Sequence, residues 1–139
     1  MLRVLLPVDG SENSDRAVKA LIRQLPLFRE VPEVHLMNVQ HPFPGTVHRV
    51  QHLAEQAHRE EGLRALASAR KLLEDAGVRY TQYIGVGDVA GLIARYVKDN
   101  NIKQIAMGTR GRSAIVGLLL GSTTQKVVHL TDVPVLLVK

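Results

Sequence analysis

The sequence predicts one doubly wound α/β domain over residues 1–139, with a five-stranded parallel sheet in the strand order 3-2-1-4-5 and helices on both faces. Short apolar runs alternate with segments of helical periodicity, and each connection is long enough to join parallel neighbours. Asp9 follows the first apolar run and Gly108 follows the fourth. Because ligands of such sheets bind beyond the carboxyl ends of strands where strand order reverses, these two strands are expected to be neighbours.

The first strand is expected over residues 2–8, a run that is apolar on both sides and so suits a buried strand. Ser11 or Ser14 can cap the following helix, whose apolar positions recur at helical spacing until about Pro26. Residues 34–39 alternate in part between apolar and polar, which predicts the second strand.

The middle of the chain reads as a loop and one long helix. Residues 41–45 contain prolines and a glycine, and residues 50–76 are rich in Glu, Gln, Ala, Arg and Leu up to a stop at Gly77. Residues 85–88 predict a turn with Asp88 as a helix N-cap. The remaining expected elements are strands at 78–84, 102–107 and 133–138 and helices over about 89–97 and 122–130.

Composition limits the classes of partner. The chain has 18 Lys and Arg against 13 Asp and Glu, giving a net charge of +5 that favours anionic partners. Its aromatic content of 4% and the lack of a basic tail argue against nucleic acid. The absence of cysteine excludes disulfides and thiolate metal sites. With no signal peptide and no apolar stretch long enough for a bilayer, we expect a cytoplasmic protein without membrane contact.

Gly108, Gly111, Gly121 and Ser122 form a Gly-x2-Gly-x9-Gly-Ser pattern after the fourth expected strand. Glycines after a strand let backbone N–H groups approach an anion, and a Ser/Thr cluster opening a helix adds hydroxyls to the free first-turn amides. The pattern therefore predicts a phosphate cradle that differs from the P-loop and from the dinucleotide fingerprint. On glycine spacing alone, a surface loop with helix caps is an equally good interpretation.

Several segments along the chain match the pattern of a known family. They are Pro7-Val8-Asp9-Gly10-Ser11, Met37-Asn38-Val39, Met107-Gly108-Thr109-Arg110-Gly111, Gly121-Ser122 and Val133-Pro134-Val135-Leu136-Leu137-Val138. On these segments the chain resembles the universal stress protein family, and specifically its ATP-binding branch. The resemblance covers essentially the whole chain and includes the complete glycine pattern, so it implies an ATP-binding protein.

The resemblance implies particular contacts with ATP. Val39 would receive the adenine edge through its backbone, Asp9 would border the adenosine, and Gly108 would lie by the ribose. The phosphates would be held by Gly111, Gly121, Ser122 and the Thr123 amide. The full set of predicted nucleotide-contacting residues is Pro7, Val8, Asp9, Val39, Met107, Gly108, Arg110, Gly111, Gly121, Ser122, Thr123 and Thr124.

Further expectations concern the phosphates. Mg²⁺ or Mn²⁺ should accompany ATP and be held by phosphate oxygens and water, since the sequence offers no cluster of carboxylates. Arg110, Arg112 and Lys126 could face the phosphates or solvent equally well. A positive φ angle is expected at Gly121, so a valine there should block phosphate approach and strain the backbone.

Three functions fit the sequence: an ATP-binding regulatory or stress-response protein, a slow ATPase, and a nucleotide-free dimeric scaffold. The intact glycine pattern argues against the scaffold. No paired carboxylates and no Ser-His-Asp spacing mark a catalytic residue, and Asp9 is only a weak candidate for orienting water, so turnover should be slow or absent. The last expected strand, apolar on both faces, would leave an open edge, which predicts a homodimer through it.

Six histidines raise the question of a metal site. His48 and His52 are spaced i, i+4, which places both on one face of a helix. No third ligand is evident, because His41 lies in the proline-containing loop and His58 faces elsewhere on the helix. We therefore expect solvated or loop-packing histidines and no protein-only metal site.

Overall fold

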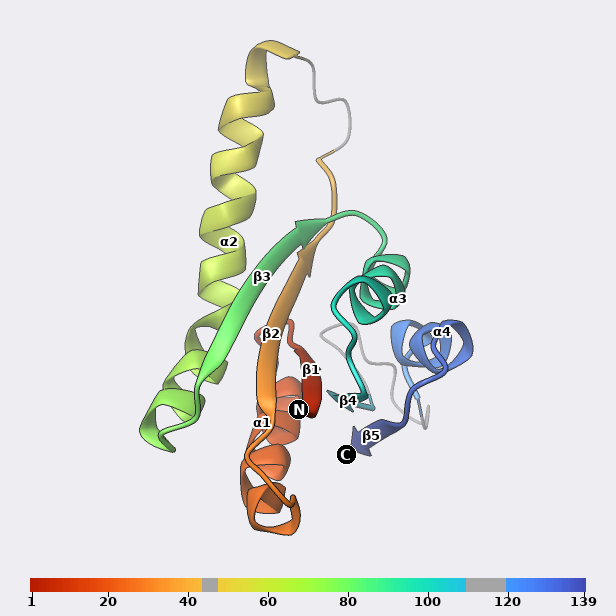
Figure 1. Cartoon of the computed structure of the whole chain (residues 1–139). Coiled ribbons are helices and arrows are strands. Elements are labelled where there is room, and N and C mark those ends of the chain that lie inside the picture. Colours follow the sequence, from red (N-terminus) through yellow and green to blue (C-terminus); the bar gives the residue numbers. More distant parts are fainter. Residues whose placement is uncertain (44–47, 110–119) are drawn as a thin grey trace.

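The computed structural model describes residues 1–43, 48–109 and 120–139, and the side chains of these residues except 48–51. Within these ranges it confirms the predicted parallel sheet, with the order β3-β2-β1-β4-β5 (Figure 1). The strands are β1 (Arg3–Pro7), β2 (Glu33–Gln40), β3 (Tyr80–Val86), β4 (Gln104–Gly108) and β5 (Val135–Val138). The helices are α1 (Glu12–Gln24), α2 (His48–Asp75), α3 (Val89–Asp99) and α4 (Ser122–Leu130), with the short 3₁₀ helix η1 (Leu25–Leu27) after α1.

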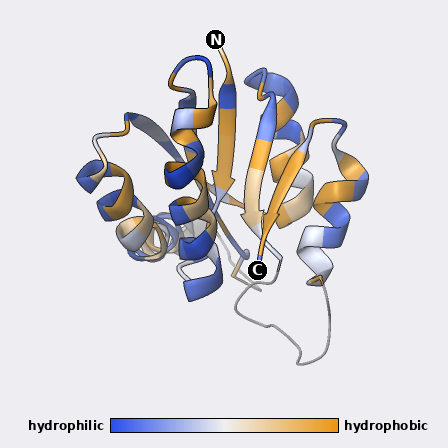
Figure 2. Ribbon diagram, turned by 90° about the horizontal axis from the view of Figure 1, so that it is seen from below, coloured by the Kyte–Doolittle hydropathy of each residue, from blue (hydrophilic) through white to orange (hydrophobic). Residues whose placement is uncertain are grey.

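The helices cover the two faces of the sheet in pairs. Alternate residues of a strand point to opposite faces, so Val4 and Leu6 pack with α1 and α2, whereas Leu5 packs with α3 and α4. Figure 2 shows the largely hydrophobic strands between helices of mixed character. This three-layer arrangement buries both faces of the central strands, as expected for a parallel sheet. None of the described helices is long and apolar enough to cross a membrane.

All five strands differ from the predicted ranges by one or two residues at some end, and two of the differences have a clear structural reason. β3 continues through Gly85 and Val86, which were expected in a turn, because they pair with Val39 and Gln40 of β2. β5 begins at Val135 instead of residue 133, since Pro134 has no N–H for the ladder although its carbonyl accepts from Ile105 at 2.9 Å.

The starts of α1 and α3 are capped by side chains. The Ser11 side chain accepts a hydrogen bond from the Ser14 amide at 3.2 Å, so Ser11 and not Ser14 is the N-cap of α1. Asp88 caps α3 as predicted, accepting from the Gly91 amide at 2.9 Å. In both helices a first-turn amide is therefore satisfied within the protein.

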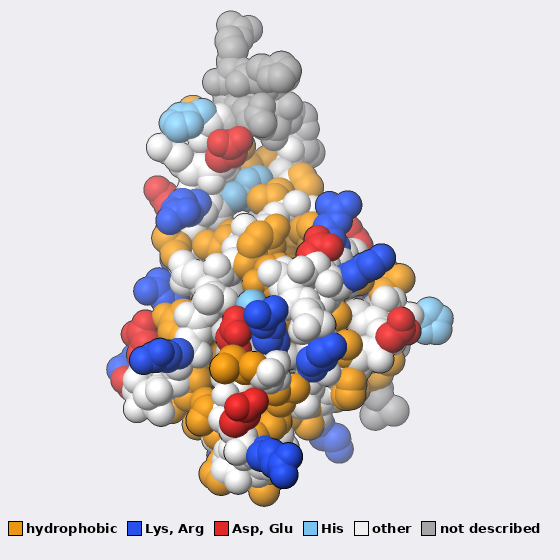
Figure 3. All heavy atoms as spheres, in the orientation of Figure 1, with side chains coloured by type: hydrophobic (Ala, Val, Ile, Leu, Met, Phe, Trp, Pro, Cys, Tyr) orange, Lys and Arg blue, Asp and Glu red, His pale blue; other side chains and the backbone are white. Residues whose placement is uncertain are grey.

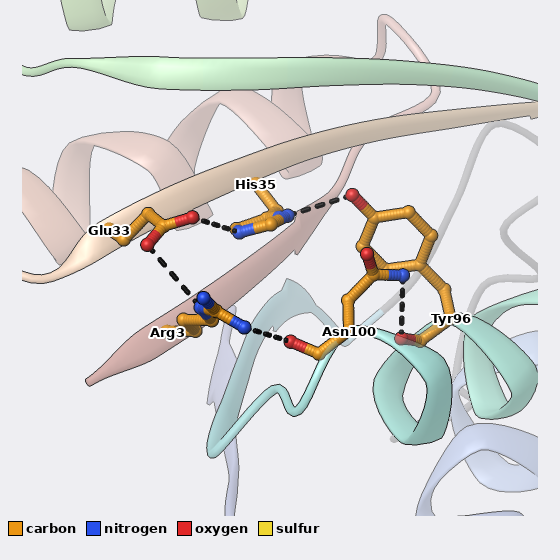
Figure 4. A network of polar contacts seen from close by, with 5 residues as sticks. All are labelled: Arg3, Glu33, His35, Tyr96 and Asn100. Atoms are coloured by element: carbon orange, nitrogen blue, oxygen red, sulfur yellow. Dashed lines mark hydrogen bonds and ion pairs between the residues drawn. The ribbon is translucent and has the colours of Figure 1, made fainter. Parts of the chain in front are cut away.

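A polar network joins β1, β2 and α3 (Figure 4). His35 is 7% exposed, with Nε2 2.9 Å from Glu33 Oε1 and Nδ1 2.7 Å from the Tyr96 hydroxyl. Because a carboxylate can only accept, Nε2–H donates to Glu33 and a neutral ring then accepts from Tyr96. Arg3 donates to Glu33 Oε2 at 3.3 Å and to the Asn100 carbonyl at 3.0 Å. Both ring nitrogens of this buried histidine are thus satisfied.

The network makes stability depend on the charge of Glu33. The hydrogen bond from His35 lowers the pKa of Glu33 below its ordinary value, the positive charge of Arg3 lowers it further, and desolvation opposes both. The folded protein therefore holds this proton less tightly than the unfolded chain. The stabilisation is present above the ordinary glutamate pKa and is lost as pH falls through the lowered folded-state value.

We expect Glu33→Gln to flatten this part of the pH dependence. The free energy of unfolding of the parent, measured in urea, should fall as pH is lowered through and below the ordinary glutamate pKa, and that of the variant should fall less over the same range. Glu61→Gln is the matched control, because Glu61 forms an exposed ion pair with Arg64 at 2.8 Å. Identical pH profiles for the parent and Glu33→Gln would contradict the prediction.

Candidate functional site

The carboxyl ends of β1 and β4 meet where strand order reverses. β1 pairs with β2 on one side and with β4 on the other. The chain leaves β1 for α1 on one face, and α4 packs on the opposite face. The structure thus confirms that the strands ending at Asp9 and Gly108 are neighbours at the place where doubly wound sheets bind ligands.

The end of β2 directs the Val39 backbone toward the region beyond the end of β1. The Val8 amide donates to the Met37 carbonyl at 2.8 Å, so the peptide groups of Met37 face β1. Peptide groups of alternate residues in a parallel strand point the same way, and those of Val39 therefore face the region beyond the end of β1. The Val8 carbonyl, which would continue the ladder, accepts from the Asn38 side chain at 2.8 Å.

Asn38 is a positioning residue that was not among the predicted site residues. It is 3% exposed, and the Gln40 side chain donates to its Oδ1 at 2.6 Å while its own amide binds Val8. This chain of hydrogen bonds fixes the separation of the β1 and β2 ends. The available signal was one polar residue between apolar residues of a buried strand, which requires a partner inside the fold.

Gly108 is required by packing between β4 and α1. A Cβ atom at this position would collide with the Asn13 side-chain oxygen and would lie 3.1 Å from the Asn13 carbonyl oxygen. The absent side chain therefore allows α1 to approach the end of β4. Gly108 therefore has a structural role, and its contact with the ribose stays a prediction.

Thr109, which follows β4, is hydrogen-bonded to Gly121, which precedes α4. The Thr109 amide donates to the Val138 carbonyl at 2.9 Å, and the Thr109 carbonyl accepts from the Gly121 amide at 2.7 Å. Gly121 is therefore held at the end of β4. The predicted contacts Arg110 and Gly111, and the flanking Arg112, lie outside the described residues.

Gly121 is the N-cap of α4 and has no capping side chain. Its φ of −68° and ψ of 160° are accessible to any residue, so the expected positive φ is wrong. The first intrahelical bond runs from the Gln125 amide to the Gly121 carbonyl at 3.0 Å. Ser122 and Thr123 are exposed residues, and their amides precede that bond, where a helix has no intrahelical acceptor for them.

α4 differs in this respect from α1 and α3. The side chains of Ser11 and Asp88 accept hydrogen bonds from first-turn amides of those two helices. At the N-cap of α4 stands a glycine, which has no side chain to do so. Helix N-termini attract anions through free amides and the helix dipole. Of these three helix starts, α4 is the one suited to an external anion.

The other predicted residues have mixed roles. Asp9 is half-buried, and its Oδ1 accepts from the Ser11 amide at 2.9 Å. Thr124 is 3% exposed and donates its hydroxyl to the Gly108 carbonyl at 3.2 Å, which leaves only its amide for a ligand. The buried side chains of Val8 and Met107 belong to the clusters on opposite faces, and Pro7 lies half-buried in β1.

The histidines of the described region do not gather around a metal. His58 packs under the loop after β2, with Nε2 2.9 Å from the His41 carbonyl and its ring stacked on Phe43 at 4.2 Å between centroids. His52 is exposed, and the His48 side chain lies outside the described ones. Among the described residues, no group of three or more His, Cys, Asp or Glu side chains could hold a metal ion.

Comparison with known proteins identifies the family of this fold. A sequence profile of the universal stress protein family matches residues 1–139. The chain belongs to the universal stress protein family. It is 31% identical over 139 residues to universal stress protein MJ0531 of Methanocaldococcus jannaschii, covering 99% of this chain and 81% of that protein.

Solved structures of similar fold include relatives with and without a named ligand. The structure of hypothetical protein MJ0577, from the same archaeon, is 26% identical with a TM-score of 0.80, covering 99% of this chain and 95% of that one. A universal stress protein family protein of Arabidopsis thaliana with AMP bound is 17% identical with a TM-score of 0.71. The match covers 100% of this chain and 92% of that one. At 17% identity, the likeness to the Arabidopsis protein concerns the fold.

Proposed function

We propose that this universal stress protein binds ATP at the carboxyl ends of β1 and β4, as a regulatory nucleotide-binding module with slow or no hydrolysis. The observation that carries the proposal is the start of α4, where Gly121 leaves the first-turn amides without a side-chain acceptor. Ser122 and Thr123 add exposed hydroxyls beside those amides. Such a set of donors suits a phosphate chain.

The adenine would bind at the end of β2. Val39 offers one N–H and one C=O beyond the end of β1, and the Watson–Crick edge of adenine carries the complementary acceptor and amino donor. Asp9, which follows β1 directly, would border the adenosine. A similar fold with AMP bound supports an adenine nucleotide as the ligand class.

A divalent ion would be held mainly by the nucleotide. Mg²⁺ keeps several waters and commonly binds phosphate oxygens with few protein ligands. Asp9 Oδ1 already accepts a hydrogen bond from the Ser11 amide. Mg²⁺ or Mn²⁺ is therefore placed on the phosphates, where it would reduce their repulsion, and the chain supplies the amide donors.

Calorimetric titration with ATP, ADP and AMP, each with and without Mg²⁺, tests the proposal. We expect ATP to bind more tightly than AMP, because the α4 amides add contacts to the outer phosphates. Mass spectrometry of ligand released from freshly purified protein identifies what the protein carries. A protein that neither releases nor binds an adenine nucleotide would instead be a nucleotide-free scaffold.

Turnover should be far below the rates of phosphoryl-transfer enzymes. Amides that hold the ground-state phosphates do not lower a barrier unless they bind the transition state more strongly. We expect single-turnover hydrolysis well below about 1 s⁻¹ with either Mg²⁺ or Mn²⁺, against roughly 1–100 s⁻¹ in kinases. Faster hydrolysis that is lost in Ser122→Ala would make the protein an enzyme.

We also propose a homodimer in which β5 pairs with its symmetry mate. Thr109 donates to the Val138 carbonyl, so even-numbered residues of β5 face β4, and the peptide groups of Val135 and Leu137 face the open edge. Light scattering should give the mass of a dimer. Hydrogen exchange should show protected amides at Val135 and Leu137, with the amide of Gln82 on the opposite sheet edge as the control. A monomer at micromolar concentration, or rapid exchange at both β5 amides, would contradict the pairing.

A further inference from the structure

The hydrogen-bond ladder between β1 and β2 ends before β2 itself ends. Its last paired residues are Pro7 and Met37, and its last bond runs from the Val8 amide to the Met37 carbonyl at 2.8 Å. β2 continues to Gln40 beside β3, beyond the end of β1 (Figure 1). In the regular parallel pattern, the next bond would run from the Val39 amide to the Val8 carbonyl. Among the described residues this bond is not formed, so the Val39 N–H has no acceptor in the ladder.

The side chain of Asn38 takes the place of that missing donor. Its Nδ2 donates to the Val8 carbonyl at 2.8 Å. Because a carbonyl can only accept, the amide nitrogen of Asn38 must face Val8, and Oδ1 is left to accept from the Gln40 side chain at 2.6 Å. Asn38 is 3% exposed, so water competes little for either bond. A side-chain amide thus occupies the carbonyl to which the next backbone amide of β2 would otherwise bind.

The chain after β1 also turns away from β2. Gly10 has a φ of 81°, in the left-handed region that favours glycine. Asp9 Oδ1 accepts from the Ser11 amide at 2.9 Å, an Asx turn that leads into α1. In the described parts of the chain, no bond joins the Gly10 amide to the Val39 carbonyl, which would be the following step of the ladder. Both backbone groups of Val39 are therefore left without a partner on β1.

We propose that Asn38 makes the Val39 backbone available to the base of the nucleotide. By occupying the Val8 carbonyl, Asn38 ends the ladder one step early and keeps the Val39 N–H as a donor for a ligand. This inference rests on the proposed binding of ATP at the carboxyl ends of β1 and β4. The Val39 N–H donates to the ring nitrogen beside the adenine amino group, and the Val39 carbonyl accepts from that amino group. Asn38 contacts no ligand atom and is a positioning residue for base recognition.

Hydrogen exchange without nucleotide tests the first step. In the parent, the Val39 amide should exchange at least about tenfold faster, relative to its intrinsic rate, than the Met37 amide inside the ladder. In Asn38→Leu the Val8 carbonyl loses its side-chain donor and becomes the acceptor for Val39. The Val39 amide should then exchange at least about tenfold more slowly than in the parent. A substitution that only destabilised the fold would speed exchange, so the direction of the change separates the two roles.

The leucine variant should fold, because position 38 lies on the same face of β2 as Leu36, which packs in the apolar cluster with α1 and α2. A cooperative melting transition verifies this, and Asn38→Ala is a second, smaller variant that should slow the same amide. Asn100→Leu is the matched control. The Asn100 side chain also donates to a carbonyl, that of Tyr96 at 3.1 Å, but it does so at the end of α3. Its exchange at Val39 should equal that of the parent.

Calorimetry with ATP and 1-deaza-ATP, in which a C–H replaces the ring nitrogen beside the amino group, tests the second step. The parent should bind ATP at least about tenfold more tightly than 1-deaza-ATP, whereas Asn38→Leu should bind ATP more weakly and discriminate little between the two. Inorganic tripolyphosphate, which has no base, should bind the parent and Asn38→Leu alike. Acidic and basic side chains of the described residues are interspersed on the face drawn in Figure 3, so that face offers no basic patch to compete for it.

The inference is overturned if the Val39 amide is protected in the parent or if both Asn38 variants leave its exchange unchanged. It is equally overturned if the parent binds 1-deaza-ATP as tightly as ATP, or if Asn38→Leu keeps the full preference for ATP. In all these cases ATP binding by the parent would still support the proposed function. A parent that binds no adenine nucleotide would overturn the proposed function and the base-recognition role of Asn38 together, whatever the exchange at Val39.

Discussion

Gly121→Asp should abolish ATP binding without destabilising α4. At the φ and ψ of Gly121, an aspartate has N-cap geometry and can accept from the amide of Thr123 or Thr124. It would occupy the donors proposed for phosphate and place a negative charge beside them. We expect the dissociation constant for ATP to rise at least about a hundredfold, as charge-assisted hydrogen bonds are lost and repulsion is added. The melting temperature should be unchanged or higher.

Gly121→Ala is the matched control for this substitution. Alanine accepts the same backbone angles but provides no acceptor for the first-turn amides. Calorimetry should find its affinity for ATP much closer to that of the parent. Equal affinity of the aspartate and alanine variants would mean that the phosphates do not bind at the start of α4.

Gly108→Ala should destabilise the fold itself. The new methyl group would meet the Asn13 side-chain oxygen and approach the Asn13 carbonyl oxygen, which is fixed in the first turn of α1. Overpacking of this kind costs about 1–3 kcal/mol in unfolding free energy. Urea denaturation should show the midpoint lowered.

A double-mutant cycle with Asn13→Ala separates the two contacts at Gly108. Removing the Asn13 side chain relieves the closer clash but leaves the backbone oxygen at 3.1 Å. The double variant should therefore recover part of the stability lost in Gly108→Ala. A Gly108→Ala protein as stable as the parent would show that α1 can move away from β4 at little cost.

The strand order was predictable because two residues suited to a ligand site each follow a strand that is recognisable in the sequence. Asp9 and Gly108 each follow an apolar run, and the rule that ligands bind at a strand-order reversal makes those strands neighbours. The capping role of Asp88 was equally local, since a carboxylate before an amphipathic segment has few other uses. These parts of the fold depend on residues close together in the sequence.

Contacts between distant segments could not be predicted in the same way. The need for glycine at 108 comes from Asn13, on another element, and the buried hydrogen bonds of Asn38 join it to Val8 and Gln40. The expected positive φ of Gly121 is wrong because this position does not need the backbone freedom of glycine. At this helix start, glycine instead leaves the amides without a side-chain acceptor.

The most direct test of ATP binding at the carboxyl ends of β1 and β4 is a ¹H–¹⁵N NMR titration of the whole protein with ATP and Mg²⁺. We expect the largest saturable shifts at the amides of Ser122 and Thr123, together with a shift at Val39. Shifts confined to the starts of α1 or α3, or none at saturating ATP, would contradict the proposed site.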